Sequence, residues 1–173
     1  MKLFTILSRL LDYPTDELMQ NLDLILNTTN ESTHMTAEEK KVIKAFVSWM
    51  CLHGTTGLQE QYVKTFDMVA EHDLHITHHL FGEERTRGPA LIDLSEHYRH
   101  EGLELTKKGE IPDYIPLMLE YISLLDDLQS RMFLGEIAKV LEILADNLDK
   151  VQSPYAPLLR VLEQRGRLAQ VAA

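Results

Sequence analysis

The sequence contains a single cysteine and no long apolar run, and both features limit where the protein can work. Cys51 has no partner for an intramolecular disulfide, which fits a reducing cytoplasm. No run of 18 uncharged apolar residues occurs, so no segment is predicted to span a membrane. The apolar first segment, MKLFTILSRLLDYP, carries Arg9 and lacks a small-residue cleavage site, so it is not predicted to be a signal peptide. We therefore expect a cytoplasmic protein.

Motifs for catalysis and phosphate binding are also missing. The sequence has no GxSxG, no phosphate-binding glycine loop, no dinucleotide fingerprint and no HExxH. Cys51 lies on the polar side of its predicted helix and does not face His53, so no activated nucleophile is apparent. We predict that the protein is not an enzyme.

Basic residues are scarce relative to acidic ones. There are 17 Lys and Arg against 27 Asp and Glu, which gives a formal net charge of −10. Such a charge argues against binding to nucleic acid or to anionic lipid surfaces. It favours a partner that is itself basic.

A two-residue alternation typical of strands is absent, whereas apolar residues recur every three or four positions. This pattern predicts an all-α bundle of about eight or nine helices, forming one domain over residues 1–173. The polar segment 27–34 is predicted to be a loop. The most apolar helix, predicted over residues 115–128, is expected to be the core of the bundle.

Several helix ends have recognisable sequence signals. Thr15 is a predicted N-cap, and Thr36 with Glu39 forms a predicted capping box. Gly54 is expected to end the helix that Thr36 begins. Thr56 with Gln59 is expected to repeat the capping box at the start of the next helix.

Half of the histidines lie close together in the middle of the chain. A helix predicted over residues 71–81 would place His72, His75 and His79 along one side, at spacings that could hold a metal ion. The carboxylates that would complete such a site are not repeated on another helix. We expect no bound metal, although a histidine-rich metal-binding bundle remains an alternative.

Two further features suggest interactions. Arg87 precedes a helix start, where a cation is unfavourable unless it pairs with a carboxylate. Residues 110–116 (EIPDYIP) form a corner stiffened by two prolines, in which Asp113 is a predicted N-cap of the core helix. This rigid acidic corner, with Tyr114 near the surface, follows a lysine-bearing loop and is a candidate peptide-docking site.

These positions carry a family resemblance that extends over about residues 5–125. It begins at LSRLLDYPTDEL and ends at the 110–116 corner. Between them lie Tyr62, Val63, Phe66, Asp67, His75, His79, Gly82, Glu83, Arg85, Arg87, Gly88, Ala90, Tyr98 and Gly102. In order and spacing they resemble the nitrate reductase assembly chaperones (NarJ type), which belong to the TorD-like group of all-helical maturation chaperones. No motif is evident beyond Arg131.

The resemblance implies a function in assembly. The protein would bind the apo catalytic subunit of a molybdenum oxidoreductase, such as the nitrate reductase α subunit, through a basic amphipathic N-terminal peptide. It would keep that subunit ready for molybdenum cofactor insertion before membrane docking, with no permanently bound cofactor of its own. The implied client-peptide-binding residues are Tyr62, Phe66, His79, Arg87, Glu110, Asp113 and Tyr114. A general helical adaptor without such a client remains open.

Overall fold

The computed structural model describes residues 2–81, 87–100, 102–103 and 111–170, and within these ranges it forms ten α-helices and no strand. The predicted all-α class is thus confirmed. In chain order the helices are α1 (Lys2–Leu11), α2 (Asp16–Gln20), α3 (Leu22–Glu31), α4 (Ala37–Cys51), α5 (Thr55–Tyr62), α6 (Ile76–Phe81), α7 (Arg87–His100), α8 (Ile115–Leu124), α9 (Asp127–Lys150) and α10 (Ala156–Gln170). In the described part of the chain, no helix is both long enough and apolar enough to cross a membrane.

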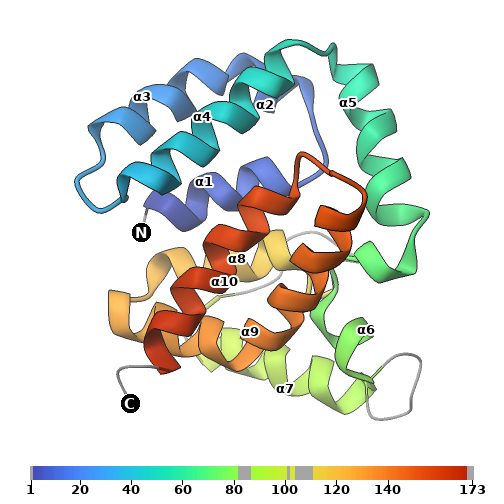
Figure 1. The fold of residues 1–173 in the computed structure, drawn as a ribbon. Helices are drawn as coiled ribbons and strands as arrows, with labels where there is room; N and C mark the ends of the chain where they lie inside the picture. The colour runs from blue at the N-terminus through green and yellow to red at the C-terminus, as the bar shows by residue number, and fades with distance from the viewer. Residues whose placement is uncertain (1, 82–86, 101, 104–110, 171–173) are drawn as a thin grey trace.

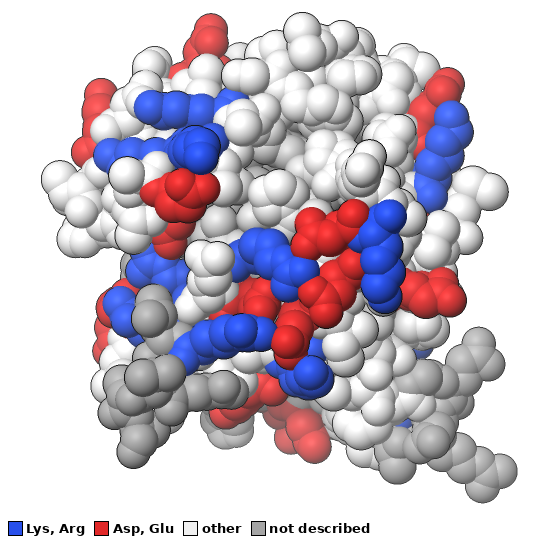
Figure 2. Space-filling model, viewed as in Figure 1, with Lys and Arg blue, Asp and Glu red and all other residues white. Residues whose placement is uncertain are grey.

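The helices form two groups that α10 joins. Figure 1 shows α1 to α5 in the upper part of the view, α6 to α9 in the lower part, and α10 running along α9 in front of both. At the centre α1 packs against α8, and the Ser8 hydroxyl donates to the Pro116 carbonyl at 2.8 Å. On the α9–α10 side, Arg160 pairs with Asp146 and Asp149, and Figure 2 shows charges of both signs interleaved there.

Two of the predicted caps are confirmed. The Thr15 side chain accepts from the Leu18 N–H at 3.1 Å. Thr36 and Glu39 form the predicted capping box, in which each side chain accepts from the other's backbone N–H, at 3.2 and 2.7 Å. Local signals are sufficient here because all the partners lie within three residues.

The predicted loop over residues 27–34 is wrong in its first half. Helix α3 continues through these polar residues to Glu31, beginning after a break at Asn21 that the sequence pattern did not show. Thr29 is buried and its hydroxyl donates to the Ile25 carbonyl at 2.8 Å. The polar side chain is thereby satisfied inside the helix, so it does not end it.

The predicted start of α5 is also wrong. Gly54 does not end α4; it occupies the N-cap position of α5, with φ of −77°. No side chain caps this helix, and the Gln59 side chain instead donates to the Pro14 carbonyl at 2.8 Å. A partner far away in the sequence therefore replaces the predicted local capping box.

The predicted core helix over residues 115–128 is two helices. Helix α8 ends at Leu124, and Asp126 begins α9 with a capping box that includes Gln129. The first part, from Ile115 to Ile122, is buried as expected, whereas Leu124 is 68% exposed. The strong cap at Asp126 explains the break, because an N-cap side chain satisfies the free N–H groups of a new helix start.

Helices α9 and α10 approach closely at a glycine. A Cβ atom on Gly166 would lie 2.6 Å from the Leu134 backbone oxygen, closer than real Cβ contacts allow. By contrast, a Cβ atom on Gly57 in α5 would meet nothing within 4 Å. Gly166 therefore sets the distance between the two longest helices of the C-terminal half.

A buried ion pair ties α4 to α10. The Arg165 guanidinium donates to Glu39 Oε1 at 2.6 Å and to Oε2 at 2.8 Å, and both side chains are under 10% exposed. Arg165 also donates to the His34 carbonyl at 3.1 Å. Burial by itself would raise the pKa of Glu39, but the hydrogen bonds and charge of Arg165 and the Thr36 N–H together lower it below its ordinary value of 4.5.

We expect Gly166→Ala to lower the free energy of unfolding by about 1–3 kcal/mol, because the added methyl group must push α10 away from α9. Gly57→Ala is the control and should raise stability by about 0.5–1 kcal/mol, because alanine favours the helix and has room. Urea unfolding of both variants measures these effects. Equal changes in the two would contradict close packing at Gly166.

We expect Glu39→Gln to destabilise the protein at neutral pH, toward the lower end of about 3–5 kcal/mol, because Arg165 keeps its bond to His34. The stabilisation that ionised Glu39 provides is fully present above the ordinary pKa of a glutamate. It is lost as the pH falls through the lowered pKa that Glu39 has in the folded protein. The difference between wild type and variant should therefore shrink between about pH 5 and pH 3. A difference independent of pH, measured by urea unfolding, would show that the carboxylate charge does not matter.

Candidate functional site

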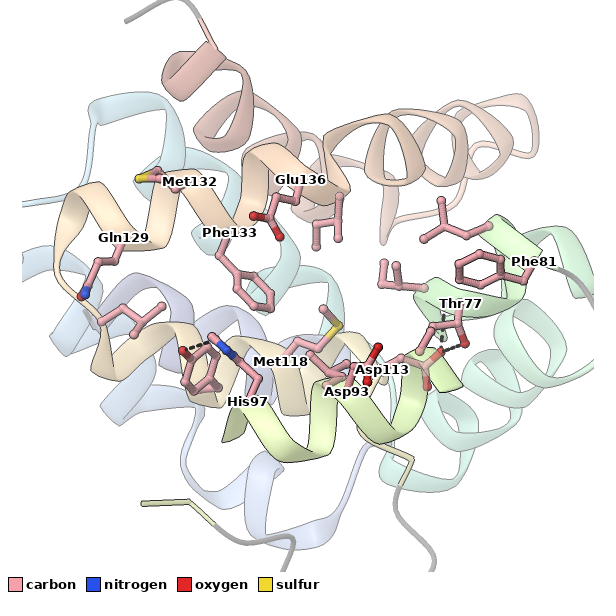
Figure 3. Close-up of a pocket in the computed structure, with 17 residues that line it drawn as sticks. Thr77, Phe81, Asp93, His97, Asp113, Met118, Gln129, Met132, Phe133 and Glu136 are labelled. Atoms are coloured by element: carbon pink, nitrogen blue, oxygen red, sulfur yellow. Dashed lines mark hydrogen bonds between the residues drawn. The ribbon is translucent and has the colours of Figure 1, made fainter. Parts of the chain in front are cut away.

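A groove of about 570 Å³ lies between α6, α7, α8 and α9. Met118 and Tyr121 of α8 line its floor, Leu94 lies on the α7 wall, Phe133 lies on the α9 wall, and Phe81 closes one end. Figure 3 shows these walls facing each other across the groove. The size and shape suit an elongated apolar ligand such as one face of a helix.

Apolar side chains in and beside this groove are exposed to water. Leu80 at the α6 end is 54% exposed and Met132 on α9 is 59% exposed. Leu128, one turn before Met132, is 67% exposed. Exposed apolar side chains that gather around a groove mark a binding site more often than scattered single residues do.

The polar groups of the groove are mainly acidic. Asp93 of α7, Glu136 of α9 and Asp113 before α8 line it, and no Lys or Arg is among its described lining residues. His97 is also at the lining, where its Nε2 atom lies 2.8 Å from the Tyr121 hydroxyl. The groove therefore combines an apolar floor with negatively charged sides.

Asp113 is fully buried and caps α6, not α8 as the sequence predicted. Its Oδ2 atom accepts from the Thr77 N–H at 2.9 Å and from the Thr77 hydroxyl. Tyr114 holds the N-cap position of α8, but its side chain makes no capping bond to that helix, and the Leu74 carbonyl accepts from the Ile115 N–H at 2.9 Å. Asp113 caps α6 because a single β-bridge, between His75 and Tyr114, sets the two segments side by side. Each segment thereby accepts from the first N–H of the other segment's helix.

Arg87 completes this cluster, which confirms that it pairs with a carboxylate. Its Nε atom donates to the Thr77 hydroxyl at 3.0 Å, and its Nη2 atom lies 4.0 Å from Asp113 Oδ2. The first turn of α7 is thereby joined to the first turn of α6 through a buried charge. Two walls of the groove depend on this cluster of Asp113, Thr77 and Arg87.

Tyr62 and Phe66 are buried, Tyr114 is half-buried, and none of the three lines the groove. The hydroxyls of Tyr62 and Tyr114 are 2.7 Å apart, and Tyr114 donates to Asp12 at 3.0 Å. Burial raises the pKa of both phenols, so both stay protonated near neutral pH. Phe66 lies on a π-helical turn, Val63–Asp67, and its ring packs 4.8 Å from that of Tyr155.

The predicted helix over residues 71–81 is broken, so the three histidines do not share one face. A 3-10 turn, Ala70–His72, is followed by the extended residues that pair with Tyr114, and only then does α6 begin. His72 Nδ1 lies 3.1 Å from the Thr65 carbonyl, whereas His79 Nε2 lies 2.6 Å from the Asp73 carbonyl. No cluster of three possible ligands suited to a metal ion occurs within the described ranges.

His75 pairs with its neighbour Asp73. The His75 Nδ1 atom lies 2.7 Å from Asp73 Oδ1, and the ring packs on Tyr114. Burial alone would lower the pKa of His75, but the hydrogen bond and charge of Asp73 raise it above its ordinary value. This histidine therefore braces the bridge to Tyr114.

Of the described residues predicted to bind the client peptide, only Asp113 lines the groove. Arg87 lies beside Asp113, and the hydroxyls of Tyr62 and Tyr114 are hydrogen-bonded to each other. The His79 side chain bonds to the Asp73 carbonyl in its own segment. Glu110 lies outside the described residues. The groove walls on α7 and α9 were missed. The available signal was a second apolar stripe on α9, in which Leu128 and Met132 repeat every four residues outside the buried face.

We expect Asp113→Asn to lower the free energy of unfolding by about 1–3 kcal/mol. The substitution removes the carboxylate charge to which Thr77 donates and beside which Arg87 lies. Hydrogen exchange of the α6 amides should accelerate more than that of α9. Asp67→Asn, at an exposed carboxylate, is the control and should change neither quantity. Unchanged α6 exchange would show that Asp113 does not hold this helix.

Comparison with known proteins agrees with this architecture. The family model described as nitrate reductase delta subunit matches residues 30–160. The nitrate reductase molybdenum cofactor assembly chaperone NarJ of Escherichia coli K12 is 32% identical over 157 residues, which are 91% of this chain and 66% of that protein. A Bacillus subtilis protein bearing the same name is 33% identical over 159 residues, 92% of this chain and 85% of its own length.

A solved structure shares the fold. The crystal structure of a redox enzyme maturation protein from Archaeoglobus fulgidus matches with a TM-score of 0.63 at 20% identity, covering 95% of this chain and 92% of that one. At this identity the likeness concerns the fold alone. The family model and the Bacillus relative each match most of the chain, and the protein belongs to the nitrate reductase delta subunit family.

Proposed function

We propose that this protein is a cytoplasmic chaperone for the apo catalytic subunit of a respiratory nitrate reductase or a related molybdenum oxidoreductase. It binds the N-terminal peptide of that subunit and keeps the subunit ready for molybdenum cofactor insertion before membrane docking. The names of its Escherichia coli and Bacillus subtilis relatives support this function. The observation that carries it is the groove, which exposes apolar side chains between acidic ones.

The energetics suit a chaperone that must release its client. Burying three or four apolar peptide side chains contributes roughly 1.5–3 kcal/mol each. Ordering the peptide and losing its free motion offset a large part of this gain. The balance allows micromolar or somewhat tighter binding that remains reversible, and no turnover or permanently bound cofactor is required.

In this proposal the family-signature residues mainly position the helices that form the groove walls. Asp113 and Arg87 hold the ends of α6 and α7, which carry two of the groove walls. Tyr62 and Tyr114 join the end of α5 to the segment before α8. Arg87, Tyr62 and Tyr114 would influence client affinity by positioning the walls rather than by touching the peptide, whereas Asp113 also lines the groove.

We expect the double substitution Leu80→Ser and Met132→Ser to weaken binding of a nitrate reductase catalytic subunit's N-terminal peptide by at least about tenfold, because each removes exposed apolar contact area. Calorimetric titration of the purified full chain measures the affinity. Leu52→Ser is the matched control, since Leu52 is 82% exposed and lies away from the groove.

The same variants test the function with the whole client. The wild-type chain should co-purify with the apo catalytic subunit, and the groove variant should not, while Leu52→Ser should behave like wild type. Deleting the client's N-terminal segment should also abolish co-purification. Capture that persists in the groove variant would place the client site elsewhere, and loss of capture in all variants and in wild type would refute the chaperone function.

A further inference from the structure

The walls of the groove define the length of the ligand that it can hold. On α7 the lining positions run from residue 90 to 97, and on α9 they run from 129 to 137. At 1.5 Å per residue, each wall is about 10–12 Å long. A helix of about two to three turns would fill this space and would act as an added member of the bundle.

Two carboxylates on opposite walls have no partner among the residues that the structure describes. Asp93 on α7 and Glu136 on α9 are both exposed and both line the groove, and Figure 3 shows them on facing sides. Within the described residues neither takes part in a hydrogen bond or an ion pair. By contrast, Glu142, further along α9, is paired with Lys139 and Arg167.

The third carboxylate of the groove has an unsatisfied oxygen. Asp113 is fully buried, and in the described part of the chain its Oδ1 atom has no hydrogen-bond partner, although Oδ2 accepts from Thr77. An unpaired carboxylate oxygen in the interior is unfavourable, and most buried polar atoms have a partner. A donor brought into the groove by a ligand would satisfy it.

We infer that Asp93, Glu136 and Asp113 form a cation seat that recognises a basic side chain at the edge of the apolar face of a bound client helix. This inference rests on the proposed peptide binding in the groove and adds its specificity. The apolar floor supplies affinity, whereas the seat fixes which residue of the helix lies at the centre of the groove. Charge complementarity of this kind contributes specificity and register.

Designed peptides provide the test. The probes are fluorescein-labelled helical peptides of about three turns, with leucines at positions i, i+3, i+4 and i+7 and a single lysine moved along the edge of the apolar face. Fluorescence anisotropy with the full chain measures their affinities. One lysine position should bind about tenfold more tightly than the same peptide with glutamine there, and substitution by glutamate should weaken binding further.

Removing the seat should abolish this preference. In Asp93→Asn/Glu136→Gln, which leaves the Asp113 cap of α6 intact, the lysine and glutamine peptides should bind within about twofold of each other. Glu31→Gln/Glu96→Gln makes the same change in net charge at exposed sites outside the groove, with Glu96 on α7 itself. This control should keep the full lysine preference.

The outcomes separate the two proposals. If the control variant loses the preference as strongly as the seat variant, long-range attraction by the net charge explains it and the seat does not exist. Peptides that bind regardless of lysine position would also overturn the seat, while leaving groove binding intact. If no peptide binds the wild-type chain, the groove is not a helix-docking site and both proposals fail.

Discussion

The buried carboxylate of Asp113 connects segments on which the groove depends. It caps α6 through Thr77, which is 36 residues away in the sequence, and it lies within 4.0 Å of Arg87 at the start of α7. The adjacent bridge between His75 and Tyr114 fixes the direction in which α8 leaves the same point. Since three groove helices begin around one charge, a change at this point is transmitted to the whole site.

This arrangement explains why several of the family-signature residues are buried. Tyr62, Phe66 and Asp113 are each less than 5% exposed. Side chains in such positions determine where helices lie, and the surface that a ligand meets is then formed by neighbouring residues such as Leu80 and Met132. Buried signature residues of this kind can position a surface without being part of it.

Charged side chains are arranged differently on α10 and around the groove. On α10, Arg160 and Arg165 pair with carboxylates of other helices, and the Arg165–Glu39 pair is buried. Around the groove, Asp93 and Glu136 remain unpaired within the described residues. Paired charges fix the packing of helices, whereas the unpaired carboxylates give the groove a negative character that complements a basic ligand.

The sequence by itself determined the helical class and those features whose partners lie within a few residues, namely the Thr15 cap and the Thr36–Glu39 capping box. It also required a carboxylate near Arg87 without naming Asp113. Only the tertiary structure decided which helix Asp113 caps, because its partner is distant in the sequence. The groove was not predicted, because its walls come from four helices whose spacing depends on long-range packing.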